Sequence, residues 1–283
     1  MGQRVNGEGK GAEAVMLVAS EIFSGAAPYY ARHAVPYPED VFRSLVRLCR
    51  LTSSSRVLDL GAGTGQIGLP LAPSVAHVFS VDPSSEMVEE GKRMATTLGV
   101  GNLDFIVSTS ENLQLPASTF DLTTVALAFH WMDRAAVLTK LSQILKPDGC
   151  VAVIDRVREH SEPSEWYDAM VKDITDFWGG SLPAGPGGER PLLKQSHREV
   201  LAASDFNEIT ELRHYYRYHW TIDDLLGWLS STAMGAPGTL GPRREGFLTR
   251  IRQLLLSYSP AGSFMDRGHI TTLIGYRGKG TGL

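Results

Sequence analysis

Five short runs of apolar residues alternate with amphipathic segments over the first half of the chain. These runs occupy residues 57–60, 75–81, 103–107, 120–129 and 150–154. Between them, apolar residues recur at helical spacing, most clearly over 87–98 and 133–145. Strands that alternate with helices predict an α/β fold with a parallel, doubly wound sheet and helices on both faces. In such a fold the ligand crevice lies at the carboxyl ends of the strands.

The segments on either side of this alternation are mainly helical in pattern. Residues 12–23 form one apolar-rich segment, and a second helix starts after Pro38, where Glu39 and Asp40 suit the positive end of a helix dipole. After residue 155 the pattern predicts helices over 166–178, 194–204, 222–231 and 247–258, strands over 209–218 and 269–276, and Gly/Pro loops over 179–188 and 235–241.

The two late strands bring the expected sheet to seven strands, mostly parallel. Because helices lie between these two strands, we expect them to form a cap over the crevice and not a separate domain. The predicted organisation is an N-terminal lid over residues 1–55, an α/β core over 56–155, and cap helices with the last strands over 156–283.

Composition and charge limit the kinds of molecule that the protein is expected to bind. The chain has 283 residues, of which 43% are hydrophobic, and a formal net charge of −4, so no global basic field favours nucleic acid. No apolar run approaches the roughly 18–20 residues of a membrane span. Two cysteines in apolar runs, Cys49 and Cys150, predict buried thiols. With a polar N-terminus, these features predict a cytoplasmic protein; its oligomeric state is left open.

A glycine-rich turn follows the first predicted strand. After Asp59 come Gly61, Gly63 and Gly65, each separated by one residue. Such a turn, at the start of a helix, lets a ligand approach the backbone and presents free N–H groups to it. The dinucleotide-binding spacing G-x-G-x-x-G is met only in a shifted frame, by Gly63, Gly65 and Gly68, so this alternative is disfavoured.

Further motifs stand after the second, third and fourth strands. The second strand ends in Asp82, 17 positions after Gly65, Glu111-Asn112-Leu113 follows the third, and Phe129-His130-Trp131-Met132-Asp133 the fourth. Together with residues 57–65, these segments resemble the motifs of class I S-adenosylmethionine-dependent methyltransferases. The resemblance covers residues 30–154 and is greatest to the small-molecule group, of the methyltransferase domain 11 type. It implies a Rossmann-like fold and S-adenosyl-L-methionine as cofactor.

The resemblance also implies a set of cofactor contacts. Asp59 would lie near the ammonium group of the cofactor, and Asp82 would accept hydrogen bonds from its ribose diol. At two positions the chain departs from the family: Thr109 stands where relatives often have an acid that binds adenine, and Ala34 replaces an arginine, for which Arg32 is the substitute. The full set of predicted cofactor contacts is Tyr30, Arg32, Asp59, Gly61, Ala62, Gly63, Gly65, Asp82, Pro83, Met87, Ser110, Glu111 and Ala128.

His130 is the predicted catalytic base. It leaves the fourth strand at the crevice, and imidazole titrates near neutrality, as a base for a hydroxyl or amine acceptor should. An equally weighted alternative is that His130 only shapes the pocket, through hydrogen bonds to the backbone. The predicted substrate contacts are His33, Phe129, Trp131 and Trp166; for each, packing or surface exposure is the simpler alternative. No histidine or acid has metal-like spacing, so no metal is expected.

Three functions remain open at this point. The first is methyl transfer to a small-molecule acceptor, with O-methylation ahead of N- or C-methylation. The second is a protein that binds S-adenosylmethionine but promotes a cyclisation without transferring the methyl group. The third is a non-catalytic binding module. The aromatic and basic segment 213–220 resembles a nucleic-acid platform, but strand alternation divides it between two faces, which favours packing under the cap.

Overall fold

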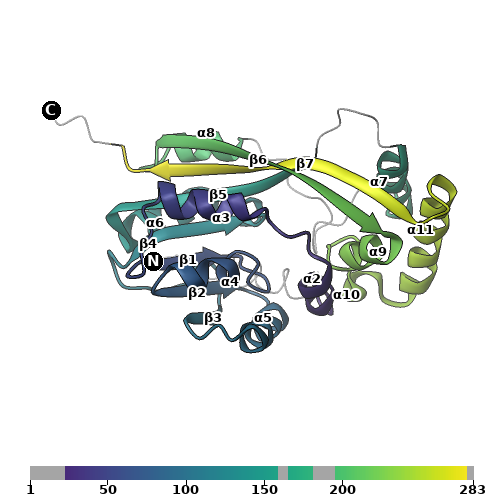
Figure 1. Cartoon of the computed structure of the whole chain (residues 1–283), viewed down its shortest axis with the longest axis horizontal. Coiled ribbons are helices and arrows are strands. Elements are labelled where there is room, and N and C mark those ends of the chain that lie inside the picture. The colour runs from purple at the N-terminus through teal and green to yellow at the C-terminus, as the bar shows by residue number, and fades with distance from the viewer. Residues whose placement is uncertain (1–22, 159–164, 181–194, 279–283) are drawn as a thin grey trace, which may run out of the picture.

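A mixed sheet of seven strands forms the centre of the fold (Figure 1). The computed structural model describes residues 23–158, 165–180 and 195–278. The strands are β1 (Arg56–Leu60), β2 (His77–Asp82), β3 (Leu103–Val107), β4 (Phe120–Ala126), β5 (Leu145–Arg158), β6 (Glu208–Thr221) and β7 (Ser263–Tyr276). Their order is β3-β2-β1-β4-β5-β7-β6. The first five strands pair in parallel, as predicted, whereas β7 runs antiparallel to both β5 and β6.

Alternate residues of the strands enter two separate cores, one on each face of the sheet. Val57 packs on the face covered by α3 (Glu39–Leu48), α4 (Gly68–Leu71) and α5 (Ser85–Leu98). Its neighbour Leu58 packs on the opposite face, under α6 (Arg134–Ile144) and α8 (His197–Ala202). Because both faces of the parallel strands are buried, these strands have continuous apolar runs. The doubly wound arrangement is therefore confirmed.

Short polar side chains fix the starts of the helices that flank the crevice. The Ser84 hydroxyl accepts a hydrogen bond from the backbone N–H of Met87 at 3.3 Å and caps α5, which ends at Gly99 with φ 69°. The Asp133 carboxylate caps α6 in the same way, by accepting from the N–H of Ala136 at 3.1 Å. Both starts follow a strand, so the caps set where the chain turns at the crevice.

Three sequence-based boundaries are corrected by the structure. The strand expected over 120–129 ends at Ala126, because Leu127 adopts φ 53° and turns the chain out of the sheet into a 3-10 turn, Phe129–Trp131. A helix that the sequence pattern does not predict, α2 (Ala27–His33), precedes Pro38, and the 235–241 loop contains α10 (Pro237–Leu240). In both helices proline occupies the first turn, where its missing N–H costs nothing. The helix expected over 12–23 and most of the 179–188 loop lie outside the described residues.

A two-stranded ribbon carries the cap away from the main sheet (Figure 1). The last residue of β5 pairs with Gly268, but β6 and β7 stay paired as far as Thr221 and Ser263. Beyond β5 the ribbon packs with α7 (Glu165–Phe177), α9 (Ile222–Ser230), α10 and α11 (Arg244–Tyr258) in a third core. As predicted, one face of β6 bears the buried aromatics, including Trp220, which is 1% exposed.

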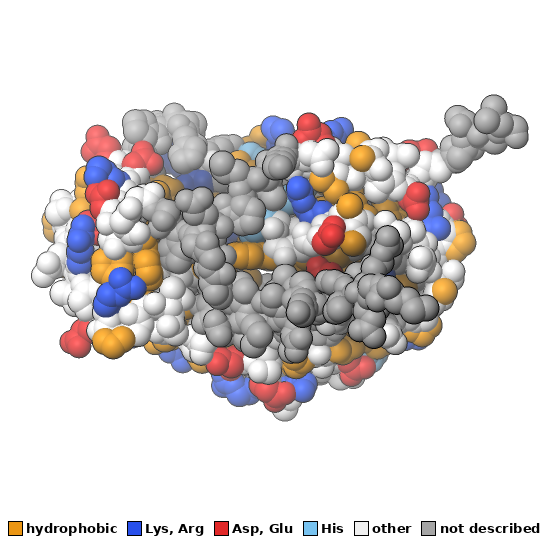
Figure 2. Space-filling view, turned by 180° about the vertical axis from the view of Figure 1, so that it is seen from behind, with side chains coloured by type: hydrophobic (Ala, Val, Ile, Leu, Met, Phe, Trp, Pro, Cys, Tyr) orange, Lys and Arg blue, Asp and Glu red, His pale blue; other side chains and the backbone are white. Residues whose placement is uncertain are grey.

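The burial of the two cysteines and the mixed surface charge match what the composition predicts. Cys49 and Cys150 are free and buried, as expected. Within the described part of the chain, no helix combines the length and apolar content that a membrane crossing needs. Figure 2 shows the face opposite to that of Figure 1, where acidic and basic side chains are interspersed on the visible surface.

Candidate active site

The glycine turn between β1 and α4 has a backbone that only glycine adopts without strain. Gly61 and Gly63 have φ values of 65° and 55°, in the left-handed region. A Cβ atom on Gly61 would lie 2.4 Å from the Cβ of Ala128, and one on Gly63 would lie 3.0 Å from Cε1 of Tyr30. The turn is thus enclosed by the 3-10 turn after β4 on one side and by α2 on the other. This enclosure brings residues from distant parts of the sequence to one backbone segment.

Asp82 ties the end of β2 to the glycine turn. One carboxylate oxygen, Oδ2, accepts a hydrogen bond from the Gly63 N–H at 2.8 Å, and the other, Oδ1, accepts from the Ser84 N–H at 2.9 Å. Burial raises the pKa of Asp82, and the two backbone hydrogen bonds oppose that rise. Each carboxylate oxygen has a further lone pair, so the group is able to accept ligand hydroxyls as well.

Asp59 is the most perturbed acid of the crevice. It is 1% exposed, and its Oδ1 accepts a hydrogen bond from the Thr124 hydroxyl at 2.7 Å. Its Oδ2 is buried and has no hydrogen-bond partner among the described residues. Burial raises the pKa of Asp59 to about 7, although the hydrogen bonds from Thr124 and the Gly68 backbone oppose the rise. A half-satisfied buried carboxyl is costly, and a cationic ligand group would satisfy it.

Helix α2 closes the crevice with Tyr30. The ring lies against Gly63, and Tyr30 also packs on a small apolar cluster that contains Met87, at the start of α5. Burial raises the pKa of Tyr30 to about 12; the charges of Asp82 and Asp59 raise it further, and Arg156 lowers it. Tyr30 therefore stays a neutral hydroxyl at physiological pH, within the electrostatic reach of both acids.

Arg156, and not Arg32, brings positive charge to the crevice. Its Nη2 donates to the carbonyl of Val35 at 2.8 Å, and its guanidinium carbon lies 5.5 Å from the ring centroid of Tyr37. Its Nη1 is buried and has no partner among the described residues. A buried donor of this kind suits an anionic ligand group. Sequence reasoning missed Arg156, although its place two residues after the apolar run 150–154 was a usable signal.

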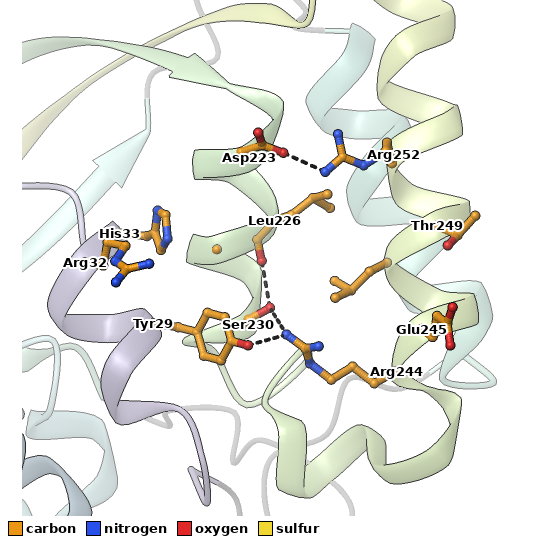
Figure 3. A pocket seen from close by; sticks show the side chains of 12 residues that line it. Tyr29, Arg32, His33, Asp223, Leu226, Ser230, Arg244, Glu245, Thr249 and Arg252 are labelled. Atoms are coloured by element: carbon orange, nitrogen blue, oxygen red, sulfur yellow. Dashed lines mark hydrogen bonds and ion pairs between the residues drawn. The ribbon is translucent and has the colours of Figure 1, made fainter.

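Arg32 and His33 lie on the far side of α2. His33 Nδ1 is 3.3 Å from Asp224 Oδ1, on α9, and both Arg32 and His33 line a groove between α2, α9 and α11 (Figure 3). Helix geometry explains this placement, because residues 29, 32 and 33 share a face that Tyr30 does not. The structure therefore does not bring the predicted cofactor contact Arg32 or the predicted substrate contact His33 to the glycine turn.

The loop after β3 is held by a lysine that the sequence did not indicate. Lys140 Nζ donates to the backbone carbonyls of Ser110, at 3.2 Å, and Leu113, at 2.9 Å, and also to that of Glu111. Burial lowers the pKa of Lys140, and Glu111 opposes this. Thr109, which replaces the family's acid, accepts a hydrogen bond from the Asn112 N–H at 3.1 Å. Threonine thus stabilises this loop, and the buried Ser110 hydroxyl lies beside it.

The 3-10 turn after β4 separates its three aromatic residues. Phe129 is 1% exposed and packs in the core 5.1 Å from the His197 ring, so its ring points away from any solvent-accessible crevice. His130 and Trp131 are partly exposed, with their ring centroids 5.3 Å apart. Trp131 also meets Phe23 edge-on at 6.3 Å. Of the residues predicted here to contact substrate, Trp131 is the one placed beside His130.

Trp166 belongs to the cap core. Its ring centroid lies 4.8 Å from that of Phe264 on β7, and it is partly buried. The side chain is therefore held by the ribbon and α7, away from the glycine turn. Among the described residues no group of three or more His, Cys, Asp or Glu side chains has the arrangement of a metal site.

The crevice residues fit the chemical groups of S-adenosylmethionine. The buried Oδ2 of Asp59 suits its ammonium group, and the buried Nη1 of Arg156 suits its carboxylate. Asp82 suits a ribose diol, and the glycine backbone leaves room that a Cβ would fill. The apolar Met87 and Pro83 lie at the next strand end, beside Ser84.

Comparison with known proteins agrees with this geometry. Residues 57–149 match the family described as methyltransferase domain. The uncharacterized methyltransferase YcgJ of Bacillus subtilis is 31% identical over 134 residues, which are 47% of this chain and 53% of that protein. The aklanonic acid methyltransferase DauC of Streptomyces sp. (strain C5) is 28% identical over 186 residues, 64% of this chain and 76% of DauC. The sequence match thus spans about half the length of YcgJ.

Solved structures share the fold at low sequence identity. The crystal structure of YcgJ has a TM-score of 0.54 and 20% identity, and covers 86% of this chain and 100% of YcgJ. The [4+2]-cyclase SpnF has a TM-score of 0.56 and 16% identity, and covers 94% of this chain and 98% of SpnF. At this identity the likeness concerns the fold. Residues 57–149 therefore match the methyltransferase domain family in sequence, and the chain shares the fold of these solved structures.

Proposed function

We propose that this protein is an S-adenosylmethionine-dependent methyltransferase that acts on a small-molecule acceptor, with a hydroxyl oxygen as the preferred methylated atom. The observation that carries the proposal is the hydrogen bond from the Gly63 N–H to Asp82, which joins the glycine turn to the acid after β2. This bond places a diol-binding carboxylate beside a backbone that admits a ligand.

When bound, S-adenosylmethionine supplies an electrophilic methyl group on a positively charged sulfur. The chain has to hold that molecule in one orientation, because positioning provides much of the rate of a displacement reaction. Asp59 and Arg156 would bind its amino-acid end through opposite charges, and Asp82 its ribose. Tyr30, closed over the turn by α2, would exclude water from the same segment.

His130 would remove the proton of the acceptor hydroxyl. The 3-10 turn places it at the carboxyl end of β4, one residue before Trp131 and directly after the Ala128–Phe129 segment that packs on the glycine turn and the core. Imidazole is neutral over part of the physiological range, so it is able to accept a proton there. Trp131 would form an aromatic wall beside the acceptor. A hydroxyl acceptor is favoured over carbon because it makes use of this base.

The second candidate is a cyclase that binds S-adenosylmethionine without transferring its methyl group. The observation that favours it is the likeness in fold to SpnF, over 94% of this chain. The crevice residues that hold the cofactor would be unchanged in that case, and the cap aromatics would fold an elongated substrate. The likeness to DauC, which is named as a methyltransferase, favours methyl transfer over cyclisation.

A labelling experiment separates the two candidates. The protein is incubated with methyl-labelled S-adenosylmethionine and a panel of phenols, carboxylic acids, amines and polyenes, and S-adenosylhomocysteine and label in the product are followed. Label transferred to oxygen is expected. Label on carbon would overturn the O-methylation proposal alone, whereas conversion of a polyene without label would favour the cyclase.

Asp82→Asn tests the cofactor assignment without requiring an acceptor. Loss of one charged acceptor for ribose is expected to weaken S-adenosylhomocysteine binding by roughly 10- to 100-fold, since hydrogen bonds to charged groups contribute about 1.5–3 kcal/mol. Titration calorimetry measures the affinity. Asp148→Asn, an exposed carboxylate in the turn before the buried part of β5, is the matched control. Equal affinities for the two variants would contradict the ribose assignment.

A further inference from the structure

A groove outside the crevice is lined by two arginines, Arg32 and Arg244, that form no ion pair with any described residue (Figure 3). It lies between α2, α9 and α11 and has a volume of about 640 Å³, within the range of small-molecule sites. Tyr29 and Arg32 reach it from α2, Ser230 from α9, and Arg244 from the start of α11. None of these residues belongs to the crevice at the glycine turn.

Arg244 is fixed in the groove without a carboxylate partner. Its Nη2 donates to the Tyr29 hydroxyl at 2.8 Å and lies 3.5 Å from the Ser230 hydroxyl. The guanidinium carbon is 5.1 Å from the Tyr29 ring centroid, and Nε is buried with no partner among the described residues. Two hydroxyls and a ring thus hold a full positive charge, and no acid in the described ranges neutralises it. This leaves the charge available to a ligand.

Arg32, on α2, adds a second available cation to the groove. Its side chain is exposed, and it makes no hydrogen bond or ion pair with any residue in the part of the chain that the structure describes. Figure 3 shows it next to His33, on the α2 wall above Tyr29. Arg32 and Arg244 therefore approach the groove from different helices, an arrangement suited to holding an anion between them.

The acids of the groove do not cancel these charges. Asp223 is paired with Arg252, whose Nη2 is 2.6 Å from Asp223 Oδ1. Glu245 is exposed and lies on α11, on the side of the groove away from Arg32 (Figure 3). His33 is paired with an acid on α9 and is neutralised when charged. Among the charged side chains that line the groove, Arg32, Arg244 and Arg252 outnumber Asp223 and Glu245 by one.

The middle of the groove is apolar and tightly built. Leu226 from α9 and Leu248 from α11 line it between the two walls. Gly227 lets His33 pack directly on α9, because a Cβ there would lie 2.3 Å from Cδ2 of the His33 ring. The close packing of α2 on α9 sets the position of the Arg32 side chain. The groove thus joins a cationic end to an apolar floor.

We propose that this groove is a binding site for a small organic anion, with a carboxylate or phosphate group between Arg32 and Arg244 and an apolar body over Leu226 and Leu248. The site is independent of the crevice, since it faces the opposite side of α2 from Tyr30. Affinity depends mainly on two exposed or half-buried arginines, so it falls with ionic strength.

Titration calorimetry with matched probes tests this site. Hexyl phosphate and hexanoate share an alkyl chain and differ in the anionic group, and 1-hexanol lacks a charge. Saturable one-site binding of at least one anion is expected, with at least tenfold weaker binding of 1-hexanol and a loss of affinity when sodium chloride is raised from 50 to 500 mM. The anion that binds more tightly identifies the headgroup.

Arg32→Glu reverses one charge of the site at an exposed, unpaired position, where folding is not at risk. It is expected to weaken anion binding at least tenfold. Arg47→Glu, the same change at an exposed arginine of α3, is the control and is expected to keep the affinity of the unmodified chain. Arg244→Gln removes the other charge and is also expected to weaken anion binding. Equal binding of 1-hexanol and the anions, or an unchanged affinity in Arg32→Glu, would overturn the proposal.

Discussion

Asp59→Asn is expected to remove a large part of the pH dependence of stability. In the folded chain Asp59 is fully buried, and burial raises its pKa from 3.8 to about 7, with the Thr124 hydroxyl and the Gly68 backbone opposing the rise. Asparagine has nearly the same shape and keeps an oxygen that accepts the hydrogen bond from Thr124. The substitution therefore removes the ionisable group while it preserves the packing.

The sign and size of the effect follow from linkage. Between pH 3.8 and 7 the folded chain holds the Asp59 proton and the unfolded chain does not, so the free energy of unfolding falls as pH rises. The stabilising effect of the protonated carboxyl is complete below pH 3.8 and is lost as pH rises through 7. A shift of about 3 pH units corresponds to an upper limit of about 4 kcal/mol. Of this, about 3 kcal/mol develops between pH 5 and 8.

Urea unfolding of both proteins at half-unit steps from pH 5 to 8 measures this difference. The difference in unfolding free energy, Asp59→Asn minus the unmodified chain, is expected to grow with pH, because groups common to both proteins cancel. Asp148→Asn, at an exposed position, is expected to show no such growth. If the difference for Asp59→Asn did not change with pH, burial would not raise the pKa of Asp59 as described.

The same carboxyl should couple cofactor binding to pH. An ammonium group beside Asp59 favours the charged carboxylate, so binding releases a proton near neutrality. Under the proposed function, S-adenosylhomocysteine affinity is expected to rise between pH 6 and 8 in the unmodified chain. In Asp59→Asn that rise should be lost. If affinity rose equally with pH in both proteins, Asp59 would not be a contact of the cofactor's ammonium group. The prediction about unfolding would be unaffected.

Three further changes test other parts of the crevice. Arg156→Gln is expected to weaken S-adenosylhomocysteine binding roughly 10- to 100-fold, the effect of a lost charged hydrogen bond, in calorimetry; a larger loss in Arg32→Gln would restore the sequence-based assignment. Gly61→Ala adds a Cβ 2.4 Å from Ala128 and is expected to destabilise the fold by about 2–4 kcal/mol in urea unfolding. Gly99→Ala, with a similar φ but open space, should cost only about 1–2 kcal/mol; equal losses would argue against the clash. His130→Ala is expected to lower turnover by about 10²–10⁴-fold at unchanged cofactor affinity, and full turnover would exclude it as the base.

The alternation of core strands with helices and the ligand end of the sheet were predictable from the sequence. Short apolar runs bounded by turn residues define buried parallel strands, and the acids and glycines that follow them necessarily meet at one edge. The starts of α5 and α6 lie within two residues of the predicted ones, because the caps at Ser84 and Asp133 depend on residues within one turn of each other. Such local signals need no knowledge of the rest of the fold.

The errors fall where a local pattern does not set the outcome. The apolar run over 120–129 is suitable for a strand throughout, but the left-handed Leu127 ends it, and the turn places Phe129 in the core. Pro237 lies in the predicted 235–241 loop, and Pro28 lies where the pattern predicts no helix, although each stands in the first turn of a helix. Proline is compatible with both outcomes, so only the packing of α2 and α10 decides between them.

For this chain, the sequence alone determined the α/β alternation, the glycine turn and its acids, because each depends on neighbours along the chain. Tertiary structure decided which cation lies near Tyr30 and the glycine turn. Arg32 is only two residues from the position of the family's arginine, but the 3.6-residue helical repeat turns it toward α9. Arg156, 120 positions from Pro36, reaches the crevice because β5 ends beside that segment. A contact between residues so distant in the chain is set by the pairing of strands and the packing of α2, which no local pattern specifies.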